Sequence, residues 1–276
     1  MPRPIITAAL TGPVATKADN AGMPGNVAEI AADAKACHEA GAAVIHIHLR
    51  DDRGEMTADL GVARRTVEAV REVCPGITQL STGGLQFTYE ERMRLVEAKP
   101  AMATLNPCTM TFAAAEFRNP PKQMMELAAR MIELGVKPEV EIYDTGHLEM
   151  MLYLLHKELL VPPLQVSFVM GVRGGMKGDP GLLAYLVREL PEGTSWQVIG
   201  VARANLPMTA AGLAMGGNAR TGMEDTLALE KGVPAESNRQ LVERLVGIAQ
   251  SMQLQPASVA EVVERLELHP ELVNGA

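Results

Sequence analysis

Short apolar runs and longer amphipathic runs alternate along nearly the whole chain. The short runs have the length of strands, whereas the longer runs repeat their apolar positions at helical spacing. Strands are therefore predicted at residues 4–10, 43–49, 77–81, 102–105, 139–143, 165–169, 195–200 and 218–221. Helices are predicted at residues 27–40, 59–73, 88–97, 121–134, 147–155, 180–189, 207–215 and 237–252.

This alternation predicts an α/β fold, and a (β/α)8 TIM barrel in preference to an open doubly wound sheet. No Ser/Pro-rich linker or block of charge divides the chain, so residues 1–276 are expected to form a single TIM-barrel catalytic domain. Residues 255–276 are expected to form a C-terminal helical extension, with a helix at 258–266 that packs on the barrel or on a neighbouring subunit. The strand at 218–221 is too short to be identified by periodicity alone.

The composition of the chain argues against nucleic-acid binding and against a membrane-spanning protein. The net charge of −8 argues against binding to the backbone of a nucleic acid, which requires clustered cations. No run of about 18 apolar residues is present, so no transmembrane helix is expected. The chain shows no leader-like segment at its start, and its three cysteines form no CxxC pair. These features predict a cytoplasmic protein in a reducing compartment.

Two histidines end the second predicted strand, in the sequence Val44-Ile-His-Ile-His. Side chains alternate along a strand, so His46 and His48 share one face at a separation of about 7 Å. That spacing lets two imidazoles reach one metal ion, and imidazole is a ligand of zinc and its neighbours. The alternative is a pair of buried histidines with hydrogen-bond partners and no metal.

A third metal ligand is predicted in the glycine-rich loop after the eighth strand. A catalytic zinc has three protein ligands and an open position. Because a barrel closes on itself, strand eight lies one strand away from strand two, and Glu224 can reach the histidines. Arg220 and Asp225 lie in the same loop and indicate a packed, functional segment. The alternative for Glu224 and Asp225 is capping of a helix on a solvated loop.

Other strand ends carry further polar groups. Active sites of TIM barrels lie at the carboxyl ends of the strands, so these groups are candidates for substrate contacts. They are Ser81, Thr82, Gly83 and Gly84 after the third strand, Asn106 after the fourth and Glu141 in the fifth. The paired glycines are equally typical of a tight turn, and a buried structural acid is the alternative for Glu141. Arg173 and Lys177, after strand six, suit either the phosphates of coenzyme A or a solvated loop.

With these motifs in order, the chain resembles the β-keto acid cleavage enzymes, whose founding activity is 3-keto-5-aminohexanoate cleavage. The matching segments are residues 6–12, 39–51, 81–84, 141–146, 216–225 and the helix that starts at 237. They cover nearly the whole chain in the expected order, and the ordered set is far more specific than any one motif.

The resemblance implies a zinc-dependent (β/α)8 enzyme, usually a homotetramer. It implies that a β-keto acid and acetyl-CoA react to give acetoacetate and a new acyl-CoA through a retro-Claisen step. Zinc is expected, although another divalent metal would fit the same ligands. The implied residues are His46, His48 and Glu224 for the metal, Arg220 and Asp225 for the substrate carboxylate and proton transfer, Ser81 or Thr82 beside the reacting carbonyl, and Glu141 as an active-site acid.

The chain departs from the resemblance at one position. Some members, including the aminohexanoate enzyme, carry an acid after the segment that matches residues 11–12. Here residues 13–15 are Pro-Val-Ala, and Val14 cannot pair with an ammonium group. A substrate with an uncharged distal end is therefore expected.

Two other classes of function remain open on the residues alone. A metal-dependent aldolase or hydrolase of the TIM-barrel class could use the same ligands without coenzyme A, and a binding protein would not turn over at all. Dependence on acetyl-CoA distinguishes the three. The hydrolases with a His-x-His pair normally carry it on the first strand, whereas here it lies on the second.

Overall fold

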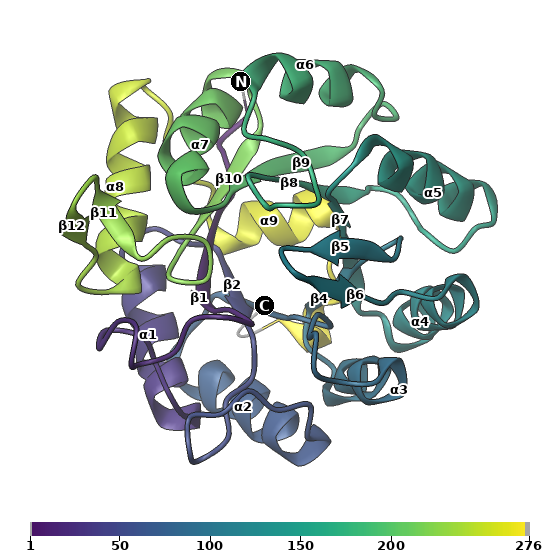
Figure 1. Cartoon of the computed structure of the whole chain (residues 1–276), viewed down its shortest axis with the longest axis horizontal. Helices are drawn as coiled ribbons and strands as arrows, with labels where there is room; N and C mark the ends of the chain where they lie inside the picture. The colour runs from purple at the N-terminus through teal and green to yellow at the C-terminus, as the bar shows by residue number, and fades with distance from the viewer. Residues whose placement is uncertain (1, 274–276) are drawn as a thin grey trace.

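Eight parallel strands form a closed barrel at the centre of the computed structural model, which describes residues 2–273 (Figure 1). The order around the barrel is β1-β10-β9-β8-β7-β4-β3-β2, so the first and last barrel strands are neighbours. The strands are β1 (Ile6–Thr11), β2 (Val44–Ile47), β3 (Ile77–Leu80), β4 (Met102–Leu105), β7 (Lys137–Ile142), β8 (Gln165–Met170), β9 (Ser195–Gly200) and β10 (Asn218–Thr221). All eight predicted strands are present, and the predicted TIM barrel is confirmed.

Helices surround the barrel between successive strands (Figure 1). They are α1 (Val27–Glu39), α2 (Leu60–Val73), α4 (Pro121–Leu134), α5 (Thr145–His156), α6 (Pro180–Arg188), α7 (Asn205–Ala214) and α8 (Asn238–Ser251). Side-chain caps fix several starts, as where Asn26 accepts from the Glu29 N–H and Ser237 accepts from the Gln240 N–H. None of the helices within residues 2–273 is long and apolar enough to cross a bilayer.

The structure divides one predicted helix and adds two hairpins. The helix predicted at 88–97 consists of α3 (Tyr89–Met93), which begins with a capping box at Thr88, followed by the 3-10 helix η1 (Arg94–Ala98). Another 3-10 turn, η2 (Ala202–Ala204), precedes α7. The hairpins are β5 (Met110–Phe112) with β6 (Ala115–Phe117), and β11 (Ala228–Glu230) with β12 (Val233–Pro234).

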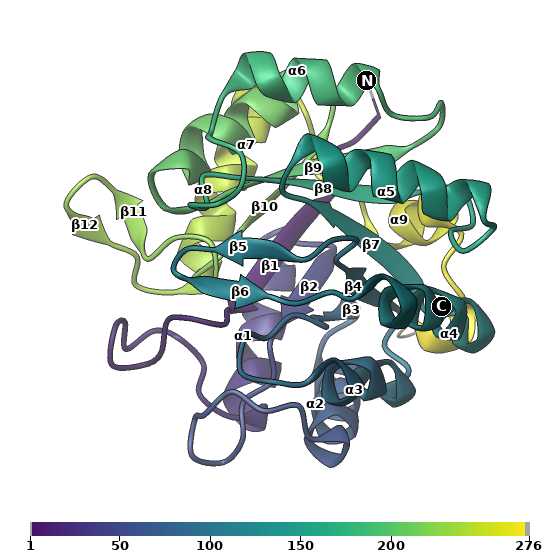
Figure 2. The ribbon, with the colours of Figure 1, turned by 45° about the vertical axis from the view of Figure 1, so that its right-hand side comes forward.

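The β5–β6 hairpin extends from the loop after β4 and lies over the barrel in both ribbon views (Figures 1 and 2). Its residues Met110 and Phe117 pack in one apolar cluster with Tyr143, Val169 and Ile199, which lie at or just after the ends of β7, β8 and β9. The hairpin therefore covers part of the carboxyl face, where the βα loops of a barrel carry its active site.

The C-terminal extension closes the opposite end of the barrel. The helix α9 (Val259–Leu266) and the turn η3 (Pro270–Leu272) follow α8, and α9 lies behind the barrel strands in Figure 1. Val262 and Leu266 are fully buried in the cluster that contains Ile5 and Val136, residues that lie at the starts of β1 and β7. The Ala257 N–H also donates to the Pro4 carbonyl at 2.9 Å. Of the two predicted positions for this helix, the structure therefore has the one on the barrel.

If α9 is part of the barrel core, shortening its buried leucine should destabilise the whole domain. We expect Leu266→Ala to lower the free energy of unfolding by about 2–5 kcal/mol, the usual range for a leucine removed from a packed core. Glu264→Ala, at an exposed position of the same helix, is the control and should change the free energy by less than about 0.5 kcal/mol. Equal stabilities of the two variants in urea unfolding would show that α9 is not part of the cooperative core.

Candidate active site

Two buried histidines lie at the carboxyl end of β2. His46 is in the strand, and His48 follows just after its end, with ring centroids 5.5 Å apart. The backbone beyond the strand is held by Thr11, whose hydroxyl donates to the His48 carbonyl at 2.6 Å and accepts from the His48 N–H at 3.2 Å. Both imidazoles face Glu224, so the prediction that they share one face is confirmed.

Glu224 reaches the histidines because β10 pairs with β1, and β1 pairs with β2. The loop after β10 crosses close to the end of β1, where the Glu224 N–H donates to the Ala9 carbonyl at 3.3 Å. Two glycines permit this approach. A Cβ at Gly222 would lie 2.0 Å from the Ala9 carbonyl oxygen, and a Cβ at Gly12 would lie 2.6 Å from Cγ of Glu224.

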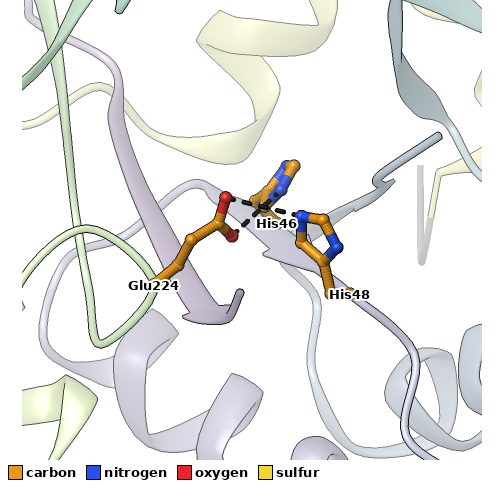
Figure 3. A group of neighbouring side chains, drawn as sticks. All are labelled: His46, His48 and Glu224. Carbon is orange, nitrogen blue, oxygen red and sulfur yellow. Dashed lines mark ion pairs between the residues drawn. The ribbon is translucent and has the colours of Figure 1, made fainter. Parts of the chain in front are cut away.

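The three side chains converge on one point (Figure 3). Glu224 Oε2 lies 3.2 Å from His46 Nε2, and Glu224 Oε1 lies 3.5 Å from His48 Nε2. One ligand atom from each residue lies within 4.8 Å of the others. His46 Nε2 and Glu224 Oε2 are buried and have no hydrogen-bond partner among the described residues. Two imidazoles and a carboxylate form a donor set that fits a divalent metal such as zinc.

Arg220 joins Glu224 to two further acids. Its Nη2 donates to Glu224 Oε1 at 2.8 Å and to Asp225 Oδ1 at 2.7 Å, and its Nε donates to Asp225 Oδ2 at 3.1 Å. Its Nη1 lies 3.8 Å from Glu141 Oε1. Glu141 also accepts from the Tyr143 hydroxyl at 3.2 Å. The structure thus brings the predicted groups Arg220, Asp225 and Glu141 together beside the His46–His48–Glu224 cluster.

Burial and the guanidinium of Arg220 shift the pKa values of Glu141, Glu224 and Asp225 in different ways. Burial raises the pKa of Glu141 to about 7, with partial opposition from Arg220. Burial also raises the pKa of Asp225, against the effect of its bidentate contact with Arg220. For Glu224, burial favours the neutral form, but Arg220, His46 and His48 together hold its pKa well below the usual range. Glu224 is therefore the carboxylate best suited to bind a metal.

The histidines also differ. Burial favours the neutral form of both, but the Glu224 carboxylate outweighs it at His46 and raises the pKa of that imidazole. At His48 burial dominates and lowers the pKa. His48 is therefore ready to bind a metal in its neutral form at neutral pH, whereas His46 has to lose a proton at a higher pH than an ordinary histidine.

Two other predicted groups lie at the mouth of the barrel. Ser81 is buried and its hydroxyl accepts from the Gly83 N–H at 3.1 Å, and a Cβ at Gly83 would lie 3.6 Å from His48 Cε1. Asn106 follows β4, whose Leu105 pairs with Val140 of β7, so Asn106 lies beside the position of Glu141. Its amide oxygen and nitrogen are both buried without a hydrogen-bond partner in the described part of the chain, so both are able to bond to a ligand.

The remaining predicted residues have other surroundings. The Thr82 hydroxyl donates to the Thr104 carbonyl at 2.8 Å and so ties β3 to β4. Gly84 lies against Phe87, where a Cβ would come within 2.6 Å of the ring. Arg173 is exposed in the loop after β8, and Lys177 pairs with Asp179 at 2.8 Å. Their predicted contacts with ligands stay predictions.

Sequence reasoning missed a buried polar chain below the site. His46 Nδ1 lies 2.7 Å from the Gln79 amide oxygen, and Gln79 in turn donates to Glu139 at 2.9 Å. Gln197 donates to the same Glu139 oxygen at 3.1 Å. The inward direction of Glu139 could have been predicted from the alternation along β7. Glu139 precedes the predicted Glu141 by two residues and therefore shares its inward face.

Arg50 was also missed, although it continues the alternation of His46 and His48. It is buried, and its Nη2 donates to the carbonyls of Gly12 and Ala15 at 2.7 and 3.1 Å. Arg50 thereby holds the loop that carries Val14, a residue that is 72% exposed.

Comparisons with known proteins identify the family. The sequence model of the beta-keto acid cleavage enzyme family matches residues 3–268. The 3-keto-5-aminohexanoate cleavage enzyme of Acetoanaerobium sticklandii is 39% identical over 269 residues, which cover 96% of this chain and 98% of that protein. The 3-oxoadipate:acetyl-CoA acetyltransferase of Cupriavidus necator is 32% identical and covers 98% of this chain and 97% of its own length.

The fold has a counterpart among solved structures. The ternary complex of ObcA with a C4-CoA adduct and oxalate superimposes with a TM-score of 0.80 at 18% identity, over 90% of this chain and 68% of that one. At this identity the likeness supports the barrel alone. The resemblance that the sequence motifs indicated is confirmed by the family match and by relatives that align over almost their full length. The chain belongs to the beta-keto acid cleavage enzymes.

Proposed function

We propose that this chain condenses a β-keto acid with acetyl-CoA to give acetoacetate and a new acyl-CoA. One observation carries the proposal: the buried atoms His46 Nε2 and Glu224 Oε2 face each other at 3.2 Å without a hydrogen-bond partner in the described residues, and they lie next to the ion pair of Arg220 with Asp225. The proposed metal site and the proposed proton-transfer pair would thereby be adjacent. The 39% identity to a 3-keto-5-aminohexanoate cleavage enzyme and the 32% identity to a 3-oxoadipate:acetyl-CoA acetyltransferase support the reaction class.

The proposed cofactor is zinc, held by His46, His48 and Glu224. Imidazole nitrogens and a carboxylate oxygen are ligands that suit zinc, and three protein ligands would leave a position for the substrate. The bound cation would act as a Lewis acid toward the keto oxygen of the substrate. Around it, the protein supplies the charges and hydrogen-bond donors that orient the β-keto acid.

Asp225 is the proposed base. The reaction begins when a proton leaves C2 of the β-keto acid, between its two carbonyl groups, and a carboxylate with a raised pKa is the stronger base for that step. Arg220 holds both Asp225 oxygens and so fixes their direction. Its Nη1 has no hydrogen-bond partner among the described residues and is the proposed contact of the substrate carboxylate.

The carbon–carbon steps then balance without any further reagent. The C2 carbanion attacks the acetyl carbonyl, and the thiolate of coenzyme A leaves as the new C–C bond forms. The thiolate next attacks the original keto carbon, the bond from that carbon to C2 breaks, and the proton returns to C2. The products are acetoacetate and the acyl-CoA of the remaining fragment.

Polar groups at the mouth of the barrel are the proposed stabilisers of charge on oxygen during these steps. The buried amide of Asn106 has no protein partner in the described residues, and its NH2 group could donate to a carbonyl oxygen that becomes negative. Gly83 borders His48, and its N–H is occupied by the Ser81 hydroxyl oxygen, so the proton of the Ser81 hydroxyl is the proposed donor at this position. Glu141, whose pKa is raised to about 7, is the proposed second acid of the site.

The proposal also covers the binding of coenzyme A, the compartment and the oligomeric state. Arg173, exposed after β8, is the proposed contact for the phosphates of coenzyme A. We also propose a cytoplasmic homotetramer. The cysteine pattern supports the compartment, and the homotetramer is the assembly that the family resemblance implies.

Zinc affinity should fall as the pH is lowered from 8, and the decline should begin above pH 6.5. Protons compete with the metal for His46, and the Glu224 carboxylate raises the pKa of that imidazole above 6.5. Competition with a chelator across the pH range measures the dissociation constant. His46→Gln should bind far less metal, whereas His147→Gln changes another buried histidine and should bind as the wild type does. An affinity that is constant from pH 8 to 6 would contradict the assignment.

Asp225→Asn should retain one metal per chain but lose about 10²–10⁴-fold in kcat, because an amide cannot take the C2 proton. The new acyl-CoA, quantified by mass spectrometry with acetyl-CoA and a panel of β-keto acids, reports the rate. Asp179→Asn, which changes an aspartate of the loop after β8, should react at the wild-type rate. Turnover of the wild type without acetyl-CoA would instead indicate an aldolase or a hydrolase.

Substrates with an uncharged distal end should be preferred over a 5-amino substrate, because Val14 offers no charge to an ammonium group. We expect Val14→Glu to shift kcat/KM toward the amino substrate by about five-fold, since an exposed ion pair contributes at most about 1 kcal/mol. Val14→Leu is the matched control and should leave the ratio unchanged. Competition between the two substrates in one reaction measures the ratio, and a wild-type preference for the amino substrate would overturn the expectation.

A further inference from the structure

The two ring nitrogens of His46 have different partners. Nε2 faces Glu224, whereas Nδ1 lies 2.7 Å from the amide oxygen of Gln79 on the neighbouring strand β3. A nitrogen that binds a metal must carry a lone pair, so the proton of a neutral imidazole has to be on the other nitrogen. An acceptor opposite Nδ1 therefore selects the form of His46 in which Nε2 is available.

The orientation of the Gln79 amide is fixed in turn by Glu139. Gln79 Nε2 donates to Glu139 Oε2 at 2.9 Å, so its NH2 side faces β7 and its oxygen faces His46. A rotated amide would place its oxygen against the Glu139 oxygen and its NH2 group against Nδ1. Two acceptor oxygens, those of Gln79 and Glu139, would then face each other, and His46 Nδ1 would lose its acceptor.

Glu139 is itself held from the far side of the barrel. Gln197 Nε2 donates to the same Oε2 at 3.1 Å and to the Ser167 hydroxyl at 2.8 Å, while Gln197 Oε1 accepts from the Thr7 hydroxyl at 3.1 Å. The side chains of Gln79, Glu139 and Gln197 are essentially inaccessible to solvent. Barrel interiors are usually filled by branched apolar side chains, so a polar chain at this depth is an unusual use of the core.

We propose that Gln79 and Glu139 are positioning residues that hold His46 with its proton on Nδ1 and so set the affinity of the metal site. The inference rests on the proposed metal-dependent function. Neither residue touches the metal position, and both act through the His46 ring. Loss of such a partner behind a metal-binding histidine typically weakens metal binding about 10–100-fold.

The test measures metal affinity and uses no activity assay. Gln79→Met keeps the length of the side chain and removes the acceptor, so zinc should bind about 10–100-fold more weakly by chelator competition. Gln165→Met is the matched control. Gln165 is an equally buried glutamine on β8, paired in register with Glu139, and no hydrogen bond links it to His46. Its variant should retain the wild-type affinity, and circular dichroism confirms that both variants are folded.

A paired exchange separates positioning from packing. In Gln79→Glu with Glu139→Gln, the new carboxylate accepts from His46 Nδ1 and from the new amide at 139. Gln197 can rotate its own amide to accept from residue 139, because the hydroxyls of Thr7 and Ser167 both donate and accept. We therefore expect the exchanged pair to bind zinc within about three-fold of the wild type, as a carboxylate behind the histidine serves the same purpose.

The outcomes distinguish this inference from the proposed function. Wild-type protein that binds no zinc would remove the metal site itself. If the wild type binds zinc, an affinity of Gln79→Met equal to that of Gln165→Met would overturn the positioning role alone. An exchanged pair as weak as Gln79→Met would also overturn it, because the acceptor opposite Nδ1 would then have been restored without effect.

Discussion

The guanidinium of Arg220 contacts three carboxylates, the buried ones of Glu141 and Asp225 and the largely buried one of Glu224. One positive charge therefore faces three acids, and the arrangement of the site depends on this imbalance. Buried carboxylates without compensation are strongly unfavourable. The raised pKa of Glu141 shows one response, in which an acid retains a proton near neutral pH. A divalent cation at the two histidines provides the other response, because it would bring one guanidinium and three carboxylates to neutrality.

This constraint explains why the loop after β10 is so tightly fixed. Glu224 and Asp225 must both meet Arg220 while Glu224 also faces β2, and small shifts would leave a buried charge unpaired. The Met223 N–H therefore donates to the buried side chain of Asn238 at 2.6 Å, and Asn238 donates to the Leu10 carbonyl at 3.0 Å. The start of α8 thereby fixes the loop against β1. The glycine at 222 allows the close crossing that this arrangement requires.

Much of the fold and part of the site follow from patterns that the sequence carries. Alternation along β2 predicts that His46 and His48 share a face, and closure of the barrel predicts that Glu224 can reach them. The β5–β6 and β11–β12 hairpins could not be predicted, because strands of two or three residues have no measurable period. The direction of the Thr82 hydroxyl and the chain through Gln79 and Glu139 depend on the register between strands, which a single sequence does not contain.

The position of α9 has a consequence for the biosynthesis of the chain. This helix covers the amino-terminal end of the barrel but follows all eight barrel strands in sequence. The ribosome makes β1 before β10, so the barrel cannot close until β10 has been made. The helix α9, which covers its amino-terminal end, is made later still. Until α9 is in place, the amino-terminal end of the barrel lacks this cover. The closed interior that strengthens the hydrogen bonds of the buried glutamines and glutamate is therefore complete only after α9 has been made.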